Sequence, residues 1–186
     1  MDHEQTLKSL FQHDPNRWHL LDLVCALELP DCWIGAGFVR NAVWDHLHGR
    51  PPSAPSGDVD VLWFDPDQVD PAIDRRMEWV LQEWAPGINW SVKNQARMHL
   101  RNGDAPYTST ADAMCHWPET ATAVAVRRSA STSCKVLAPL GLEDLFDMLI
   151  RPTRHFALHK REVHEARVSN KGWLKRWPLL RCVDND

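Results

Sequence analysis

Apolar residues recur with helical spacing at the start of the chain and in short runs of strand length further along. Residues 3–12 and 16–29 each gather apolar side chains on one face, which predicts two amphipathic helices, and Pro30 ends the second. Further helices are predicted over residues 37–48, 68–84, 95–100, 110–117, 141–150 and 154–169. Strands are predicted over residues 32–36, 58–64, 88–93, 120–127 and 134–137.

The order of these elements predicts the fold class. Helices and strands mix, and the strands cluster in the middle of the chain, which is typical of a small mixed sheet with helices packed on it. We therefore predict an α+β fold in which N-terminal helices over residues 1–30 pack on a core over residues 31–138. Residues 139–186 form a C-terminal helical extension, and the three segments make one compact unit. A chain of 186 residues with 44% hydrophobic content is long enough to bury such a core.

A glycine-rich turn joins the first predicted strand to the helix over residues 37–48. Gly35, Ala36 and Gly37 form this turn, and glycine lets the backbone approach a ligand closely. The free N–H groups at the start of the helix suit a phosphate. Arg40 lies one turn into that helix, where its planar guanidinium suits a bidentate phosphate contact, and Asn41 follows it. The alternatives are an ordinary strand-to-helix turn and a surface charge.

Two aspartates, Asp58 and Asp60, mark the next predicted strand. Because side chains alternate along a strand, both carboxylates point the same way, and their α-carbons lie roughly 6.6 Å apart. Two like charges side by side repel each other, so a fold rarely tolerates them without a cation. We therefore predict that both aspartates are metal ligands for Mg²⁺ or Mn²⁺, next to the phosphate turn. The alternative is a pair of solvated acids at a strand end.

Several other kinds of site find no support in the sequence. The glycine turn lacks the third glycine and the later acidic residue of a dinucleotide-binding fingerprint. No Gly-x-Ser-x-Gly elbow is present. The 5 cysteines are an odd number without Cys-x-x-Cys spacing, which favours reduced thiols in a cytoplasmic protein over disulfides or a zinc site. The sequence shows no secretory signal and no run of 18 apolar residues, so we expect no membrane partner.

The turn, helix and Asp-x-Asp strand together resemble the polymerase-beta-like nucleotidyltransferase superfamily. Within it, they are most similar to the head of tRNA nucleotidyltransferases and poly(A) polymerases, where Gly-Gly-x-x-Arg-Asp precedes Asp-x-Asp. The segments INWSVKNQARMH and WPETATAVAVR further resemble small bacterial proteins known as nucleotidyltransferase family proteins, over about Trp33 to Trp177. This chain has Asn41 where the tRNA enzymes usually carry the aspartate, and its loop between Gly49 and Asp58 is longer.

The resemblance implies a polymerase-beta-like sheet and a metal-dependent activity. A nucleoside monophosphate would pass from a nucleoside triphosphate to an acceptor hydroxyl, with release of pyrophosphate. Lys93, Asn94 and Arg97 follow a strand at the point where related enzymes contact the nucleotide, so we expect them to bind it; a polar helix cap is the alternative. The acceptor stays open between a small molecule, a protein side chain and an RNA end.

Superfamily members usually add a third carboxylate on a neighbouring strand. In this chain Ser91 occupies that position. Asp104, Asp112 and Glu119 are the candidates to replace it, and we predict Glu119 because it directly precedes an apolar run. A missing third carboxylate would leave less charge to hold a second metal ion.

Charge is distributed unevenly along the chain. Residues 1–93 hold 7 Lys and Arg against 15 Asp and Glu, whereas residues 94–186 hold 14 against 10. The basic half is better placed to meet an anionic partner. Two alternatives to an enzyme therefore stay open: a catalytically silent nucleotide-binding or interaction module, and an RNA-binding accessory protein that uses the basic end.

Overall fold

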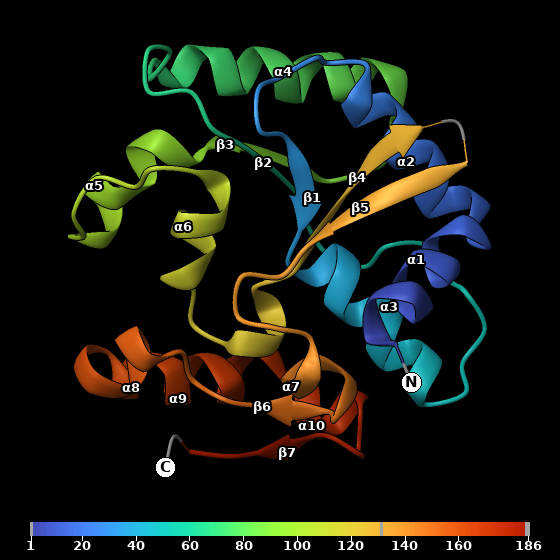
Figure 1. Cartoon of the computed structure of the whole chain (residues 1–186), viewed down its shortest axis with the longest axis vertical. Coiled ribbons are helices and arrows are strands. Elements are labelled where there is room, and N and C mark those ends of the chain that lie inside the picture. Colours follow the sequence, from blue (N-terminus) through green and yellow to red (C-terminus); the bar gives the residue numbers. More distant parts are fainter. Residues whose placement is uncertain (1, 131, 185–186) are drawn as a thin grey trace.

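A five-stranded mixed sheet forms the centre of the computed structural model, which describes residues 2–130 and 132–184 (Figure 1). The strands are β1 (Trp33–Gly35), β2 (Val59–Trp63), β3 (Trp90–Asn94), β4 (Ala125–Ala130) and β5 (Ser133–Leu137), in the order β3-β2-β1-β4-β5. β2 and β3 run parallel, and the β1–β2, β1–β4 and β4–β5 pairs are antiparallel. The predicted α+β class with a mixed sheet is therefore confirmed.

Four helices from the first half of the chain pack on one face of this sheet. They are α1 (His3–Gln12), α2 (Pro15–Cys25), α3 (Gly37–Leu47) and α4 (Pro71–Trp84). The side chains of Asp2, Asp14 and Asp70 accept hydrogen bonds from the first backbone N–H groups of α1, α2 and α4, so these helices begin where the sequence offers a cap. Their apolar faces share one hydrophobic core with β1 to β4.

The later elements lie over the other face and the lower end of the sheet (Figure 1). They are η1 (Gln95–Arg97), α5 (Met98–Asn102), α6 (Thr110–Cys115), η2 (Thr120–Thr122), α7 (Glu143–Phe146), β6 (Leu149–Ile150), α8 (Arg154–His159), α9 (Arg161–Lys171), α10 (Trp173–Arg176) and β7 (Arg181–Cys182). Trp173, Trp177 and Leu180 reach the core cluster that also contains α1 to α3. Within the described residues, no helix is long and apolar enough to cross a membrane.

Strand alternation decides which face of the sheet carries the polar side chains. Along β2, Val59 and Val61 are buried in the main core. Leu62 points the opposite way and packs with Trp33 and Met114 in a second, smaller cluster. Asp60 lies on the same side as Leu62, because side chains two residues apart share a face. The fold therefore places this carboxylate on the face that the N-terminal helices leave uncovered.

Three predicted elements differ from the observed ones. Residues 120–122 form a 3₁₀ turn, because the backbone N–H of Thr120 donates to the carbonyl of Arg151 at 3.1 Å and ties the segment to the C-terminal part. The helix predicted over 141–150 ends at Phe146, and Met148 follows with a φ of 57°. The helix predicted over 154–169 divides at Lys160, whose φ of −140° is not helical.

Candidate functional site

The turn between β1 and α3 is held in a conformation that L-residues rarely adopt. Ala36 has φ 53° and ψ −127°, and its N–H donates to the carbonyl of Val124 at 3.0 Å. A Cβ on Gly35 would lie 2.9 Å from Leu62 Cδ1 and 3.2 Å from the backbone carbonyl oxygen of Val124, so a larger residue would force its neighbours to shift. No side chain of the described residues caps α3, and Ala36 and Gly37 line a cavity. The N–H groups at the start of α3 are therefore available to a ligand.

We predict that Ala36→Gly stabilises the protein. A non-glycine residue in such a conformation costs roughly 1–3 kcal/mol. Glycine removes that strain, but it lowers the stability by roughly 0.4–1 kcal/mol because it increases the conformational entropy of the unfolded chain. The free energy of unfolding, measured by urea titration, should rise by about 1 kcal/mol. Ala42→Gly, inside α3, is the control and should lower it by about 1 kcal/mol. A lower stability of Ala36→Gly would show that the turn is not strained.

Asp58 and Asp60 line one cavity together with this turn. Asp58 is exposed just before β2, and its carboxylate accepts a hydrogen bond from the side-chain amide of Asn89. Asp60 lies in the middle of the sheet, where its register partners are Gly35 on β1 and Ser91 on β3. Neither neighbour carries a charged side chain, so the carboxylate of Asp60 faces the cavity between two small residues.

The environment of Asp60 fits a cation. Burial raises the pKa of this carboxyl, and the nearby Asp58 raises it further, while a hydrogen bond with Ser91 and the charges of Arg40 and Lys171 oppose the shift. A divalent ion would remove the repulsion between the two carboxylates. In the described residues, no group of three or more His, Cys, Asp and Glu side chains is arranged to hold a metal. The pair suits Mg²⁺, which is commonly held by one or two carboxylates, with substrate phosphates and water as its other ligands.

The cavity that Asp58 and Asp60 share has a volume of about 260 Å³. Its remaining wall is basic and comes largely from the C-terminal helices. The cations that line it are Arg40, Arg167, Lys171 and Arg176. We call it the cationic cavity, because four positive side chains face two carboxylates there. Such an arrangement can hold a strongly charged anion beside a metal ion.

A second cavity of about 390 Å³ meets the cationic cavity at Ala36, Asp60 and Arg167, which line both. Its wall contains large apolar side chains, so we call it the apolar cavity. They are Leu62, Met98, Trp117, Pro118 and Phe156. Lys93, Gln95 and Lys160 add polar groups to the same wall. The apolar cavity can therefore take a planar or apolar group with a few polar atoms.

Arg40 lines the cationic cavity, and its side chain is buried among aromatic and polar groups. Its guanidinium carbon lies 5.0 Å from the ring centre of Trp44 and 4.4 Å from that of Trp173. One terminal nitrogen donates to Thr122 Oγ1 and the other to Asn41 Oδ1, each at 2.9 Å. Burial lowers the pKa of Arg40 to about 10, although the charge of Glu119 opposes the shift. The group stays charged at neutral pH and joins α3 to the C-terminal part.

The structure places the three predicted nucleotide contacts on and after β3 in different surroundings. Lys93 lines the apolar cavity, with its Nζ 2.6 Å from Glu78 Oε1. Asn94 is 1% exposed and lines neither cavity, because its side-chain amide donates to the carbonyls of Asp65 and Gln68 at 2.8 Å each. Asn94 therefore holds the loop after β2, which corresponds to the alternative of a polar cap.

Arg97 also lies away from both cavities. It forms an ion pair with Asp74, whose side chain is 2% exposed. Asp74 accepts a further hydrogen bond from the indole N–H of Trp63 at 2.7 Å. Arg97 thus supplies the counter-charge for a carboxylate buried between α4 and the sheet. Gln95, which the sequence did not single out, lines the apolar cavity instead.

Glu119 lies behind the cavity wall. It is 1% exposed, its Oε1 accepts from Arg167 Nε at 2.8 Å, and it lines neither cavity. Asp104 accepts a hydrogen bond from Tyr107, and Asp112 accepts from the N–H of Thr108 at 2.8 Å. None of these three carboxylates contributes to the lining around Asp60. Glu119 contacts the site through Arg167, and its backbone forms an isolated β-bridge with Pro152 of the C-terminal part.

The sequence did not single out Arg167, Lys171 and Arg176. Their only signal is the basic character of the C-terminal part and the i,i+4 spacing of the first two. Trp173 and Trp177 are buried against Trp44, with ring centres 5.8 Å and 5.2 Å from it. These tryptophans therefore pack on α3 and fix the three cations over the carboxylates.

Comparison with solved structures defines the class of fold. A structure determined by NMR, described as revealing a CCA-adding enzyme head domain, is similar to this chain with a TM-score of 0.86 and 34% sequence identity. The match covers 97% of this chain and 96% of the other. The family model described as Nucleotidyltransferase matches residues 22–182. This chain belongs to that nucleotidyltransferase family, which supports nucleotidyl transfer as its general activity.

More distant matches include longer chains. The Thermotoga maritima CCA-adding enzyme complexed with tRNA has a TM-score of 0.58 at 15% identity, and a CCA-adding enzyme complexed with CTP has 0.53 at 14%. They cover 97% and 93% of this chain but only 42% and 47% of their own chains. At these identities they show the fold alone, and this chain spans less than half of their length. No curated protein matches the chain significantly.

Proposed function

We propose that this protein transfers a nucleoside monophosphate from a nucleoside triphosphate to an acceptor hydroxyl, with release of pyrophosphate. The observation that carries the proposal is the cationic cavity, where Asp58 and Asp60 share a wall with the uncapped start of α3 and four cations. A paired carboxylate beside a phosphate-binding helix start is what nucleotidyl transfer requires. Membership of a nucleotidyltransferase family agrees with it.

The two cavities suggest how the nucleotide would lie. The triphosphate would occupy the cationic cavity, where Arg167, Lys171 and Arg176 offset its charge and the N–H of Gly37 at the start of α3 is near. The nucleoside would extend into the apolar cavity, along Trp117 and Phe156. The α-phosphate would then lie at the junction beside Asp60, where both cavities meet. Lys93, Gln95 and Lys160 are among the polar side chains that line this cavity beside the nucleoside.

Asp58 and Asp60 would hold Mg²⁺ or Mn²⁺ at this junction. The bound ion would supply charge stabilisation at the phosphate oxygens and lower the pKa of the acceptor hydroxyl. The acceptor hydroxyl would lose its proton to solvent, and its oxygen would form a bond to the α-phosphorus as the bond to the oxygen of the leaving pyrophosphate breaks. Arg167 lines both cavities and is held by Glu119, so it can stay on the α-phosphate throughout. Glu119 acts in this scheme as a positioning residue.

Nucleoside triphosphates labelled at either the α- or the γ-phosphate test the proposal. Purified protein is incubated with each triphosphate, Mg²⁺ or Mn²⁺ and a fractionated cell extract that supplies the acceptor. Label from the α-position should appear on one fraction, while label from the γ-position should be recovered only as pyrophosphate. Transfer of the γ-label to a product would identify a kinase and overturn the proposal.

One observation favours a second candidate, a silent nucleotide-binding module. Among the described residues, the lining of the two cavities contains only the carboxylates of Asp58 and Asp60. If the second metal ion requires a third carboxylate, nucleotide would bind without reacting. Calorimetry with Mg²⁺ and a non-hydrolysable triphosphate distinguishes the two candidates. Tight binding without pyrophosphate release from the natural triphosphate, across all extract fractions, would identify the silent module.

A further inference from the structure

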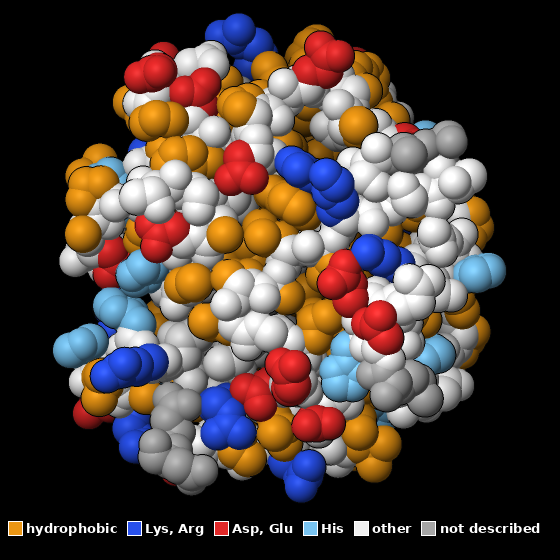
Figure 2. Space-filling model, viewed as in Figure 1, with side chains coloured by type: hydrophobic (Ala, Val, Ile, Leu, Met, Phe, Trp, Pro, Cys, Tyr) orange, Lys and Arg blue, Asp and Glu red, His pale blue; other side chains and the backbone are white. Residues whose placement is uncertain are grey.

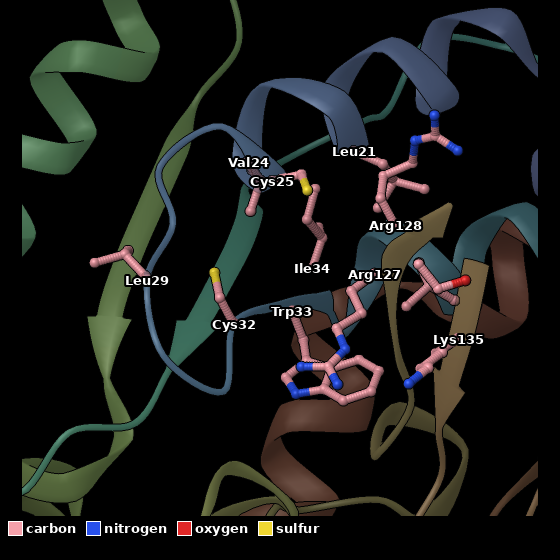
Figure 3. Close-up of a pocket in the computed structure, with 12 residues that line it drawn as sticks. Leu21, Val24, Cys25, Leu29, Cys32, Trp33, Ile34, Arg127, Arg128 and Lys135 are labelled. Atoms are coloured by element: carbon pink, nitrogen blue, oxygen red, sulfur yellow. The ribbon is translucent and has the colours of Figure 1, made fainter. Parts of the chain in front are cut away.

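A third cavity, of about 300 Å³, lies between α2 and the β4–β5 hairpin (Figure 3). It shares no lining residue with the two cavities around Asp60. One side of it is apolar and is formed by Leu21, Val24, Leu29 and Ile34. Figure 3 shows these side chains coming from α2, the loop after it and β1. The cavity is open because β1 begins only at Trp33, whereas β4 continues to Ala130 beside it.

The other side of this cavity is cationic. Arg127 on β4 and Lys135 on β5 are direct register partners, so two positive side chains stand opposite each other on one face of the hairpin. Like charges in this arrangement destabilise a strand pair. Among the described residues, neither side chain forms an ion pair with a carboxylate, and no Asp or Glu lines the cavity. The space-filling view shows Lys and Arg side chains bordering hydrophobic ones over β1 and β4 (Figure 2).

A stacking contact holds Arg127 in place, and among the described residues no hydrogen bond uses its donors. Its guanidinium carbon lies 4.2 Å from the ring centre of Trp33, and this stacking fixes the plane of the group. A stacked guanidinium keeps its N–H edges for a bidentate anion. Arg128, the next residue, points away toward α2, where it pairs with Asp22 and stacks on Trp18 (Figure 3). Because side chains alternate along β4 and β5, Arg127 and Lys135 point to the face of the sheet opposite Val126, Ile34 and α2. The cavity is lined by residues of both faces, so it reaches from the two cations past the start of β1 to the apolar side chains.

We propose that this cavity binds a small amphipathic anion, with its carboxylate or phosphate on Arg127 and Lys135 and its apolar body against Val24, Leu29 and Cys32. Charge complementarity supports an anion, since the lining holds cations and no acid. Burial raises the pKa of the Cys32 thiol in the same wall to about 12, so no thiolate offsets the cations at neutral pH. The volume of about 300 Å³ suits a small molecule. The site is independent of the proposed transferase activity.

Displacement of the fluorescent anion anilinonaphthalene sulfonate from the full chain, without nucleotide, tests this proposal. Decanoate and decyl phosphate each combine an apolar chain with an anionic group, so both should displace the probe. The one with the higher affinity shows whether the site prefers a carboxylate or a phosphate. Decanol has only the apolar chain and inorganic phosphate has only the charge. Each should therefore bind with an affinity about tenfold or more below that of decanoate or decyl phosphate. NMR should show the displacing anion shifting the indole N–H of Trp33 and the amide of Arg127.

Two variants locate the site. Lys135 is exposed, so Lys135→Ala should fold normally, and its affinity for decanoate or decyl phosphate should fall by about tenfold. Arg127→Ala should do the same. Arg75→Ala, an exposed cation on α4, is the matched control and should bind as the wild type does. Unchanged affinity in both Lys135→Ala and Arg127→Ala, or displacement by decanol as strong as by decanoate, would overturn the proposal.

Discussion

Replacing Asp58 and Asp60 together by asparagine is expected to lower metal-dependent label transfer by about a thousandfold or more. The metal ion contributes several kcal/mol of charge stabilisation in such reactions, and each 1.4 kcal/mol, roughly, corresponds to a factor of ten. Asparagine keeps the size of the side chain but removes the charge that holds the ion. The rate is measured with α-labelled triphosphate at saturating Mg²⁺, and Mn²⁺-nucleotide binding is measured separately by calorimetry.

The fold should survive this double replacement. Asp58 is exposed, and burial, together with the charge of Asp58, raises the pKa of Asp60, so the charged form of Asp60 is unfavourable without a cation. Thermal unfolding in metal-free buffer should therefore be unchanged or shifted to a higher temperature. Asp67→Asn, an exposed acid after the same strand, is the control for charge alone and should transfer label normally. Wild-type transfer by the double variant would place the metal elsewhere.

The parts of the site that the sequence predicts are local in the chain. Asp58 and Asp60 share a face because of strand alternation, and the turn at Ala36 precedes the helix that its pattern predicts. The helices and strands are predictable for the same reason, because local features determine them. The helix caps at Asp2, Asp14 and Asp70 and the alternation along β2 depend on neighbouring residues in the chain. The family resemblance, confirmed by the family match, rests on these same residues.

Tertiary contacts decide the parts that the sequence could not supply. Asn94 and Arg97 have the chemistry of nucleotide ligands, yet burial beside Asp74 and the loop after β2 gives them a structural role. Arg167 lies 107 positions after Asp60 and reaches it only because α9 packs near the carboxylates. No local pattern distinguishes such a cation from a solvated one. Glu119 as a third catalytic carboxylate stays a prediction, and its contact with Arg167 suggests positioning instead.

Arg40→Ala is expected to lower the free energy of unfolding by about 3–5 kcal/mol, because it removes one partner from a buried network of charges. The side chain lies between Trp44 and Trp173, so its loss also leaves a cavity between α3 and α10. Among the described residues, the nearby carboxylate of Glu119 would keep its ion pair with Arg167 but lose the charge of Arg40. Urea unfolding followed by tryptophan fluorescence measures the change.

The comparison with Arg176 separates a structural role of Arg40 from a direct role in nucleotide binding. Arg176 lines the same cationic cavity, and its side chain is 42% exposed. Arg176→Ala should therefore change stability by about 1 kcal/mol or less, yet weaken triphosphate binding by about tenfold. Arg40→Met keeps most of the volume, so it should recover part of the stability lost in Arg40→Ala. If Arg40→Ala unfolds like the wild type and only nucleotide affinity falls, Arg40 is a phosphate ligand and the network around Glu119 does not depend on it.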